Sequence, residues 1–309
     1  MRVLVTGGAG FIGSHVVDRL LADGHTVDIL DNLTTGRRAL LNPAARFHAC
    51  DLRSARLGDA LALARPEAVL HLAAQASVGR SVIDPLFDAS VNVLGTLALL
   101  EACRRVGVAR VVFTSSGGAA YGDTDVLPTP ENHPVHPASP YGTSKVAGEH
   151  YLECWAGLTG ASVLALRLAN IYGPRQDPRG EAGVIAIFVA RLLAGAACVV
   201  NGDGEQTRDY VYVGDVADAF ARALQYPRVS GVLNIGTGTQ TSVNDVYRRL
   251  ARLTGVGRAA EHGPARPGEQ RRSVLDASRA KEALGWTAAT PFDAGLARTV
   301  EHMRKEVPA

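Results

Sequence analysis

The chain has 309 residues, a formal net charge of +2 and a sequence pI near 8.4. This balance gives no basis for binding nucleic acid or a membrane surface, so we expect neither partner. No uninterrupted apolar run reaches the roughly 18 residues of a membrane span, and Met1 leads directly into an apolar run without a charged leader. We therefore expect a cytoplasmic location. The four cysteines lack the paired spacing of metal ligands, so we expect no metal.

A glycine-rich turn lies between a predicted strand and a predicted helix at the start of the chain. Residues 2–6 form a short apolar run that predicts a buried strand, and apolar residues at helical spacing follow over 11–21. Gly7 permits the tight turn, Gly10 lets the backbone approach a pyrophosphate, and Gly13 lets the helix pack on the sheet. The pattern predicts a phosphate site at the start of the helix.

An acidic residue ends each of the next two predicted strands. The strand over 26–30 is followed by Asp31, which lies 18 positions after Gly13, near the ~20 expected for a carboxylate on the adenosine ribose. Because a carboxylate repels a 2′-phosphate, Asp31 predicts NAD rather than NADP. Asp51 follows the strand over 46–50 and is placed to accept a hydrogen bond from the adenine amino group.

Small residues follow the strand predicted over 68–73. Leu72, Ala73, Ala74 and Gln75 come at its carboxyl end, where small side chains let a dinucleotide lie against the backbone. Asn92 is the polar exception on an apolar helix over 89–106. A buried asparagine needs partners, so Asn92 either bridges neighbouring segments or reaches the cofactor.

Hydroxyl groups and a lysine form the candidate catalytic set. Ser115 and Ser116 follow a strand over 110–114, at the sheet edge where ligands bind in doubly wound folds. Tyr141 and Lys145 follow a proline-rich loop and are four residues apart, so on a helix they face the same side. We expect the lysine ammonium to stabilise a phenolate and to lower the tyrosine pKa from its usual value near 10.

Taken together, these motifs resemble the extended short-chain dehydrogenase/reductase family, and within it the UDP-galactose 4-epimerase group, over essentially the whole chain. The resemblance implies an α/β fold with a doubly wound parallel (Rossmann) sheet and a smaller α/β substrate-binding lobe. It implies an enzyme that interconverts UDP-glucose and UDP-galactose through a transient 4-keto intermediate. Tyr141 takes the proton of the sugar 4-hydroxyl, and Ser116 or Ser115 binds the same oxygen. The implied cofactor set is Gly7, Gly10, Phe11, Ile12, Gly13, Asp31, Asn32, Leu33, Gly36, Asp51, Leu52, Leu72, Ala73, Ala74, Gln75, Asn92, Tyr141 and Lys145.

The resemblance also implies how the second half of the chain is used. Strands are expected over 162–168, 199–201 and 232–235, and helices over 181–193 and 244–253. The NAD-binding domain is expected over 1–168 plus about 209–236, and the nucleotide-sugar lobe over about 169–208 plus 237–309. Matching positions imply a substrate set of Asn170, Ala182, Gly183, Val199, Asn201, Arg208, Tyr210, Arg266, Glu269 and Ser273.

Several points stay open at this stage. Ser273 matches a position where a small side chain leaves room for an N-acetyl group, so UDP-N-acetylhexoses are expected as further substrates. A UDP-glucuronate 4-epimerase would use the same machinery. A sugar 4,6-dehydratase would need an acid pair where this chain has Gly117 and Gly118, and a non-catalytic NAD-sensing relative would tend to lack the Tyr141 and Lys145 pair. Helices that resemble those pairing across a family dimer predict a homodimer.

Overall fold

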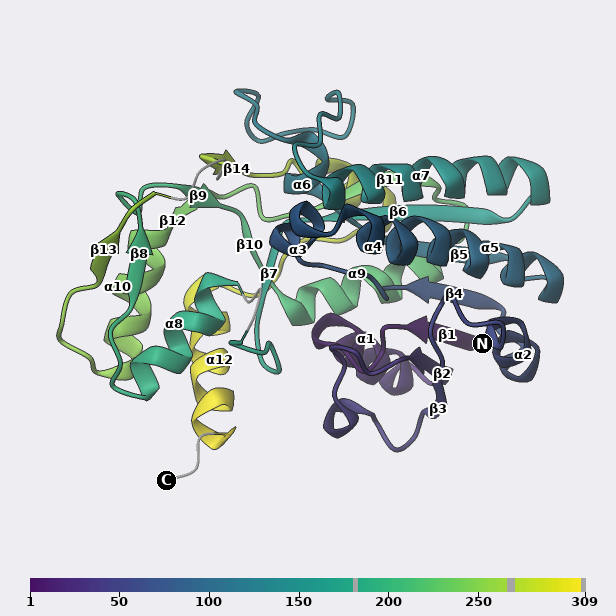
Figure 1. Ribbon diagram of the computed structural model, residues 1–309, viewed down its shortest axis with the longest axis horizontal. Helices are drawn as coiled ribbons and strands as arrows, with labels where there is room; N and C mark the ends of the chain where they lie inside the picture. Colours follow the sequence, from purple (N-terminus) through teal and green to yellow (C-terminus); the bar gives the residue numbers. More distant parts are fainter. Residues whose placement is uncertain (180–182, 266–269, 307–309) are drawn as a thin grey trace.

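The computed structural model describes residues 1–179, 183–265 and 270–306. Its centre is a seven-stranded sheet in the order β11-β6-β5-β4-β1-β2-β3, in which every neighbouring pair is parallel (Figure 1). This is the predicted Rossmann sheet. Its strands are β1 (Arg2–Thr6), β2 (Thr26–Asp31), β3 (Arg46–Ala49), β4 (Ala68–His71), β5 (Arg110–Ser116), β6 (Ser162–Leu168) and β11 (Gly231–Ile235).

Helices cover both faces of the sheet, which explains why its strands read as continuous apolar runs. Successive side chains of a strand point to opposite faces. On one face Val3 and Val5 pack with α1 (Phe11–Ala22) and α9 (Val213–Gln225). On the other face Leu4 packs with α2 (Leu57–Ala64), α5 (Gly95–Val106) and α7 (Pro140–Thr159). The fold therefore has three layers.

One helical run crosses the second of these faces. It joins α4 (Pro85–Ala89), a π-helical turn η2 (Ser90–Leu94) and α5, so the helix predicted over 89–106 begins earlier and contains a π turn at Asn92. In the described part of the chain, Pro85–Val106 alone is long and apolar enough to cross a membrane by length and composition, a test that buried core helices also pass. Leu99, Leu100 and Cys103 of this run belong to the core beneath α2 and α7, which explains its composition.

A second core lies to one side of the sheet, near the C-terminus (Figure 1). It is formed by α8 (Val184–Leu193), α10 (Val243–Thr254) and α12 (Phe292–Glu306). Short strands connect it to the sheet. β7 (Asn170–Tyr172) pairs with β10 (Tyr210–Tyr212), β8 (Val199–Asn201) with β13 (Glu261–Gly263), and β9 (Thr207–Arg208) with both β12 (Thr241–Ser242) and β14 (Arg272–Ser273). The remaining elements are η1 (Arg38–Leu40), α3 (Val78–Ile83), α6 (Gly117–Tyr121) and α11 (Ser278–Leu284).

Most predicted elements are confirmed, with changed ends. The strands over 2–6, 162–168 and 199–201 have the predicted bounds, whereas β4 stops at His71 and β5 continues to Ser116. Residues 117–121, directly after the two serines, form the short helix α6. The helix predicted over 244–253 is α10, and the Ser242 side chain caps it by accepting a hydrogen bond from the Asp245 nitrogen.

Candidate active site

The glycine turn joins β1 to α1 in the conformation that the motif requires. Gly7 has φ +71°, and a Cβ atom there would lie 2.7 Å from the backbone nitrogen of Ala73. A Cβ atom on Gly13 would overlap the carbonyl oxygen of Gly7. Gly10 is the N-cap residue of α1 and has no side chain to accept from the first-turn amides, which begin at Phe11 and Ile12. A helix start of this kind binds an anionic group.

Asp31 lies at the end of β2, beside this turn. Its carboxylate accepts hydrogen bonds from the backbone nitrogens of Ala9 (3.1 Å) and Leu33 (2.8 Å). Burial raises the pKa of Asp31, and these two bonds oppose the rise. A Cβ atom on Gly36 would lie 2.8 Å from the same carboxylate, so only glycine lets this loop approach so closely.

Asp51 is held by its own neighbours. Asn32 donates to its carboxylate at 2.7 Å and Arg53 at 2.9 Å. The Arg53 side chain is the main reason that the pKa of Asp51 lies well below its usual range. Leu52 points into the core, where it contacts Gly95. Asp31, at the end of β2, and Asp51, after β3, are thus linked by Asn32, which follows Asp31 in the chain and donates a hydrogen bond to Asp51.

The segment after β4 is fixed by hydrogen bonds from two sides. Its first amides, those of Leu72 and Ala73, donate to the backbone and hydroxyl oxygens of Thr6. The Asn92 amide accepts from the Gln75 nitrogen (2.8 Å) and donates to the Gln75 carbonyl (2.9 Å). The side-chain oxygen and nitrogen of Asn92 therefore both bind the backbone of Gln75. Of the two roles that the sequence left open, this is the bridge between neighbouring segments. Ala74 lies half-buried between these contacts.

His71 is a buried core residue at the end of β4. Its ring nitrogens share hydrogen bonds with the hydroxyl groups of Thr6 (2.8 Å) and Thr96 (3.0 Å). Burial lowers its pKa to about 3.

Tyr141 lies in the first turn of α7, and its backbone is fixed on both sides. Its nitrogen donates to the Ser81 hydroxyl (3.1 Å), and its carbonyl accepts from the Ser144 hydroxyl (2.9 Å). Ser116, the last residue of β5, lies next to the phenol group of Tyr141, and its side chain opposes the rise in the Tyr141 pKa. A strand end and a helix start thus bring two hydroxyl groups together.

Ser115 faces the opposite way. Its hydroxyl donates to Glu149 at 2.5 Å, and Glu149 in turn binds Arg167 through two hydrogen bonds of 2.9 and 2.6 Å. Ser115, Glu149 and Arg167 are all buried. Of the two serines left open by the sequence, Ser116 makes the contact with Tyr141 and Ser115 does not, because adjacent strand residues point to opposite faces.

Lys145 is buried one helical turn after Tyr141. Its ammonium donates to the Thr114 carbonyl (2.9 Å) and lies 5.8 Å from the Tyr141 ring centre. Burial lowers its pKa to about 8, opposed by the charges of Asp88 and Glu149. Burial also raises the pKa of Tyr141 to about 12, against the Ser116 hydrogen bond. The expectation that the lysine lowers the tyrosine pKa is therefore wrong for this structure, since loss of hydration outweighs any attraction from the ammonium.

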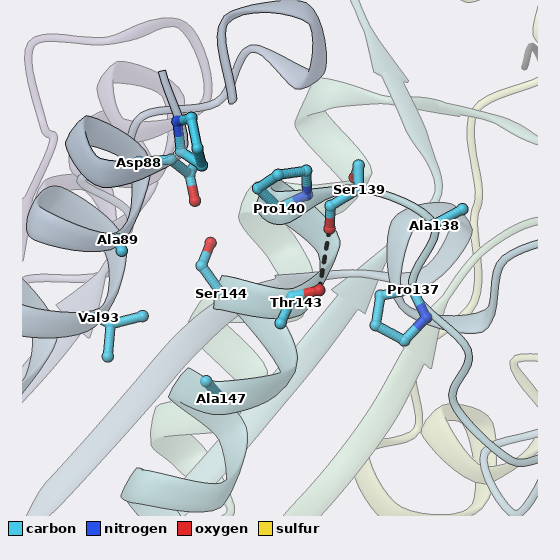
Figure 2. Close-up of a pocket in the computed structure, with 11 residues that line it drawn as sticks. Asp88, Ala89, Val93, Pro137, Ala138, Ser139, Pro140, Thr143, Ser144 and Ala147 are labelled. Carbon is cyan, nitrogen blue, oxygen red and sulfur yellow. Dashed lines mark hydrogen bonds between the residues drawn. The ribbon is translucent and has the colours of Figure 1, made fainter. Parts of the chain in front are cut away.

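A cavity of about 500 Å³ lies beside this centre, between α4 and α7 (Figure 2). In Figure 2 Asp88, Ala89 and Val93 face Pro140, Thr143, Ser144 and Ala147. At 3.6 residues per turn, Thr143 and Ala147 point away from Tyr141 and Lys145 around α7, whereas Ser144 lies between the two sides. The cavity therefore lies mainly on another side of α7 from the candidate catalytic side chains of Tyr141 and Lys145.

The predicted sugar contacts lie on the short strands of the second half. β9 and β14 place Arg208 directly opposite Ser273, and a Cβ atom on Gly118 would lie 3.0 Å from the Ser273 hydroxyl. Ser273 and Arg208 thus lie beside the helix that follows Ser116. Asn170 is exposed on β7, Val199 and Asn201 lie on β8, Gly183 caps α8, and the Tyr210 ring stacks on Phe292 inside the lobe. Ala182, Arg266 and Glu269 lie outside the described residues.

The sequence analysis missed the buried charges around the centre. These are Asp88, Glu149 and Arg167, together with Ser81. One signal was present, because Glu149 is four residues after Lys145 and continues the same helix face.

Comparison with known proteins places this site in a family. The chain is 50% identical over 311 residues to the UDP-glucose 4-epimerase of Mycolicibacterium smegmatis, covering 99% of both chains. The solved UDP-glucose 4-epimerase of Thermotoga maritima, with UDP-glucose, superposes with a TM-score of 0.97 at 47% identity and 99% coverage of both chains. That of Thermus thermophilus, with NAD, has a TM-score of 0.94 at 47% identity, covering 99% of this chain and 100% of the other. The family model for NAD dependent epimerases and dehydratases matches residues 3–236. The chain therefore belongs to the NAD-dependent epimerase/dehydratase family.

Proposed function

We propose that this protein is an NAD-dependent UDP-glucose 4-epimerase, which interconverts UDP-glucose and UDP-galactose. The observation that carries the proposal is the placement of Ser116, at the end of β5, next to Tyr141 of α7, one helical turn before the buried Lys145. Two hydroxyl groups and an amine at the carboxyl end of β5 suit proton transfer at a sugar hydroxyl. Relatives that span nearly the whole chain carry the same activity in their names.

The residues around the glycine turn fit a dinucleotide. The open first turn of α1 suits the pyrophosphate, and Asp31 at the end of β2 suits ribose hydroxyls. Neither Gly7 nor Gly13 can carry a Cβ atom, because it would overlap the backbone of Ala73 or of Gly7, so the turn is packed tightly against the sheet. When bound, NAD supplies reversible oxidation at the sugar C4.

The chain itself binds the sugar and moves the proton. Tyr141, as phenolate, takes the proton from the 4-hydroxyl and later returns it. Ser116 holds the same oxygen through its hydroxyl. Lys145 provides a positive charge next to the tyrosine ring, and Thr114 orients the lysine through its carbonyl. Burial opposes the phenolate form of Tyr141 in this structure, and Lys145 is the charge of this chain that favours it.

The second half of the chain is proposed to bind the UDP group. Arg208, with Arg266, is proposed to bind the diphosphate, since a guanidinium group matches phosphate oxygens in two places. Glu269 is proposed to bind the uridine ribose. Ser273 is small and lies beside Gly118, which supports acceptance of UDP-N-acetylhexoses. The predicted division into 1–168 plus about 209–236 and the remainder is kept here as part of the proposal.

A homodimer is also proposed, in the cytoplasm. Apolar side chains are exposed along the helices that precede and contain Asn92, including Val82, Ile83, Leu86 and Leu94. Exposed apolar groups gathered on neighbouring helices are typical of an interface between subunits. The molar mass in solution, measured by light scattering, tests this proposal.

The test of the activity is a product assay with purified protein and UDP-galactose, without added NAD. We expect UDP-glucose, because the protein is proposed to keep its NAD bound and no NAD is consumed in the reaction. Conversion of UDP-glucuronate alone would move the assignment to a glucuronate epimerase. Failure of every nucleotide sugar, with NAD still bound, would favour a non-catalytic NAD-binding protein. Absence of turnover of UDP-N-acetylglucosamine alone would reject only the Ser273 proposal.

A further inference from the structure

Glu149 joins three elements at the base of the catalytic centre. It lies on α7 and binds Arg167 of β6 through two hydrogen bonds, while the Ser115 hydroxyl of β5 donates to it. Glu149 and Arg167 are 8% and 6% exposed. We call these three residues the clamp. Because a buried ion pair contributes little net stability compared with apolar residues of similar size, its placement calls for a reason other than stability.

The clamp acts on both catalytic elements at once. Tyr141, Lys145 and Glu149 are spaced by four residues and share one face of α7. Ser115 and Ser116 are adjacent on β5, so holding the Ser115 side chain inward turns the Ser116 side chain toward Tyr141. Fixing Glu149 therefore fixes the tyrosine and the serine relative to each other.

The clamp also brings charge close to Lys145. Burial lowers the pKa of Lys145, while the carboxylate of Asp88 and, to a smaller extent, that of Glu149 favour the protonated lysine. Arg167 is held on the Glu149 carboxylate and neutralises part of its charge. Groups from five elements surround Lys145. From the helices they are Tyr141 and Glu149 of α7 and Asp88 of α4. From the strands they are His71 of β4, Phe113 and the Thr114 carbonyl of β5, and Arg167 of β6.

We propose that Glu149 is a positioning residue of this enzyme: by binding Arg167 and Ser115 together it fixes the Tyr141–Lys145 face of α7 on the end of β5, and it places a negative charge beside Lys145. The proposal rests on the function proposed above for its kinetic consequences. The effect of Glu149 on the protonation of Lys145 does not depend on which sugar reacts.

The first experiment measures the Lys145 proton directly. The chain has three lysines, Lys145, Lys281 and Lys305, so a protein labelled with ¹³C at lysine Cε gives few signals to follow by NMR as pH rises. The Lys145 signal is assigned as the one missing from Lys145→Arg. We expect it to titrate near pH 8 in the unmodified protein. In Glu149→Gln we expect this midpoint to fall by about one pH unit, because the carboxylate is gone and Arg167 is left unpaired.

A second variant guards against loss of folding. Glu149→Gln combined with Arg167→Met removes both charges, and we expect a smaller shift in the same direction. Asp28→Asn is the matched control, because Asp28 is also a buried carboxylate bound to an arginine, Arg46, but lies on β2 away from the site. It should leave the Lys145 midpoint unchanged.

The kinetic readout separates positioning from binding. In both clamp variants we expect kcat to fall by about tenfold or more with KM within about twofold, since the reacting groups lose their alignment while sugar contacts stay. The alkaline limb of the kcat profile should move to lower pH with the lysine. Ser115→Ala, which keeps both charges, should lower kcat without moving that limb.

An unchanged Lys145 midpoint in folded Glu149→Gln, or unchanged kcat in Ser115→Ala and both clamp variants, overturns the proposal. If the unmodified protein converts no nucleotide sugar, the proposed function fails, and the NMR titration still decides the role of Glu149.

Discussion

The candidate catalytic centre and the proposed sugar lobe differ in how far their charged side chains are exposed to water. Around Tyr141 the charged side chains are buried and bound to fixed partners, as in the Glu149–Arg167 pair. In the lobe the comparable pair, Asp203 with Arg271, has both side chains 57% exposed. Exposed pairs are weak and screened by water, whereas buried pairs are rigid and costly to break.

This difference follows from what each region has to do. Proton transfer depends on distances between Tyr141, Ser116 and a sugar oxygen, so its supports lie on β5, β6 and α7, which share one core. Binding a flexible nucleotide sugar tolerates adjustment, and its proposed contacts lie on strands of two or three residues. We conclude that the sheet holds the proposed proton-transfer residues in fixed positions, and that the proposed nucleotide-sugar contacts lie on less rigid segments beside it.

Tyr141→Phe tests the centre most severely. Removing the hydroxyl removes the group that carries the proton, so we expect kcat to fall by about 10³-fold, within the usual range for a general base. Bound NAD and the thermal midpoint should change little, because the ring and the helix remain. Measurement of UDP-glucose formation from UDP-galactose gives the rate. A variant with more than a tenth of the original rate would contradict the role of Tyr141.

Variants of the two serines test whether the two sides of β5 have different roles, since Ser115 lies on the buried side and Ser116 on the side of Tyr141. Ser116→Ala removes the hydroxyl next to the Tyr141 phenol, and we expect kcat to fall by about 10²-fold. Ser115→Ala removes the donor to Glu149, so its loss in kcat should be smaller, with a lower thermal midpoint because a buried acceptor loses a partner. The reverse ranking of kcat would show that Ser115 is the catalytic serine.

Lys145 gives the centre a distinct pH dependence of stability. Its pKa in the folded chain is about 8 against the usual 10.5, so between these values the unfolded chain binds more protons and the free energy of unfolding rises with pH. Relative to Lys145→Met, the unmodified protein should gain about 2 kcal/mol of stability from pH 8 to 10.5. Urea unfolding of both proteins at several pH values measures this gain, and a constant or falling difference would show that the lysine is not buried as described.

The loop that joins the two regions should matter least. Arg175 donates to Asp18 of α1 (2.6 Å), and its carbonyl accepts from Arg37 (3.1 Å). Because the ion pair is partly exposed, we expect Arg175→Ala to cost about 1 kcal/mol or less in the free energy of unfolding, with kcat unchanged. Arg179→Ala is the control, since Arg179 binds Asp177 within the same loop. A tenfold loss in kcat for Arg175→Ala would mean that recognition and chemistry are not separable here.

The sequence predicted the sheet and the site edge because these depend on local patterns. The glycine spacing and the apolar runs marked β1, β6 and the start of α1 directly. The pair β7 and β10 was missed, since three-residue strands show no periodicity and their partners are 40 residues apart.

The role of the buried polar groups was also out of reach. Ser115 and Ser116 could not be separated, because their directions depend on Glu149 and Arg167, which meet only once β5, β6 and α7 are packed. The pKa of Tyr141 was predicted in the wrong direction because four-residue spacing reports a nearby lysine but not the loss of water.

The measurement that tests the account most directly is the conversion of UDP-galactose in D₂O, followed by proton NMR without added NAD. We expect UDP-glucose that keeps protium at C4, because the hydrogen that leaves C4 returns to it while Tyr141 exchanges only the hydroxyl proton. Deuterium at C4 of the product, or no conversion at all by folded protein with bound NAD, would contradict the account.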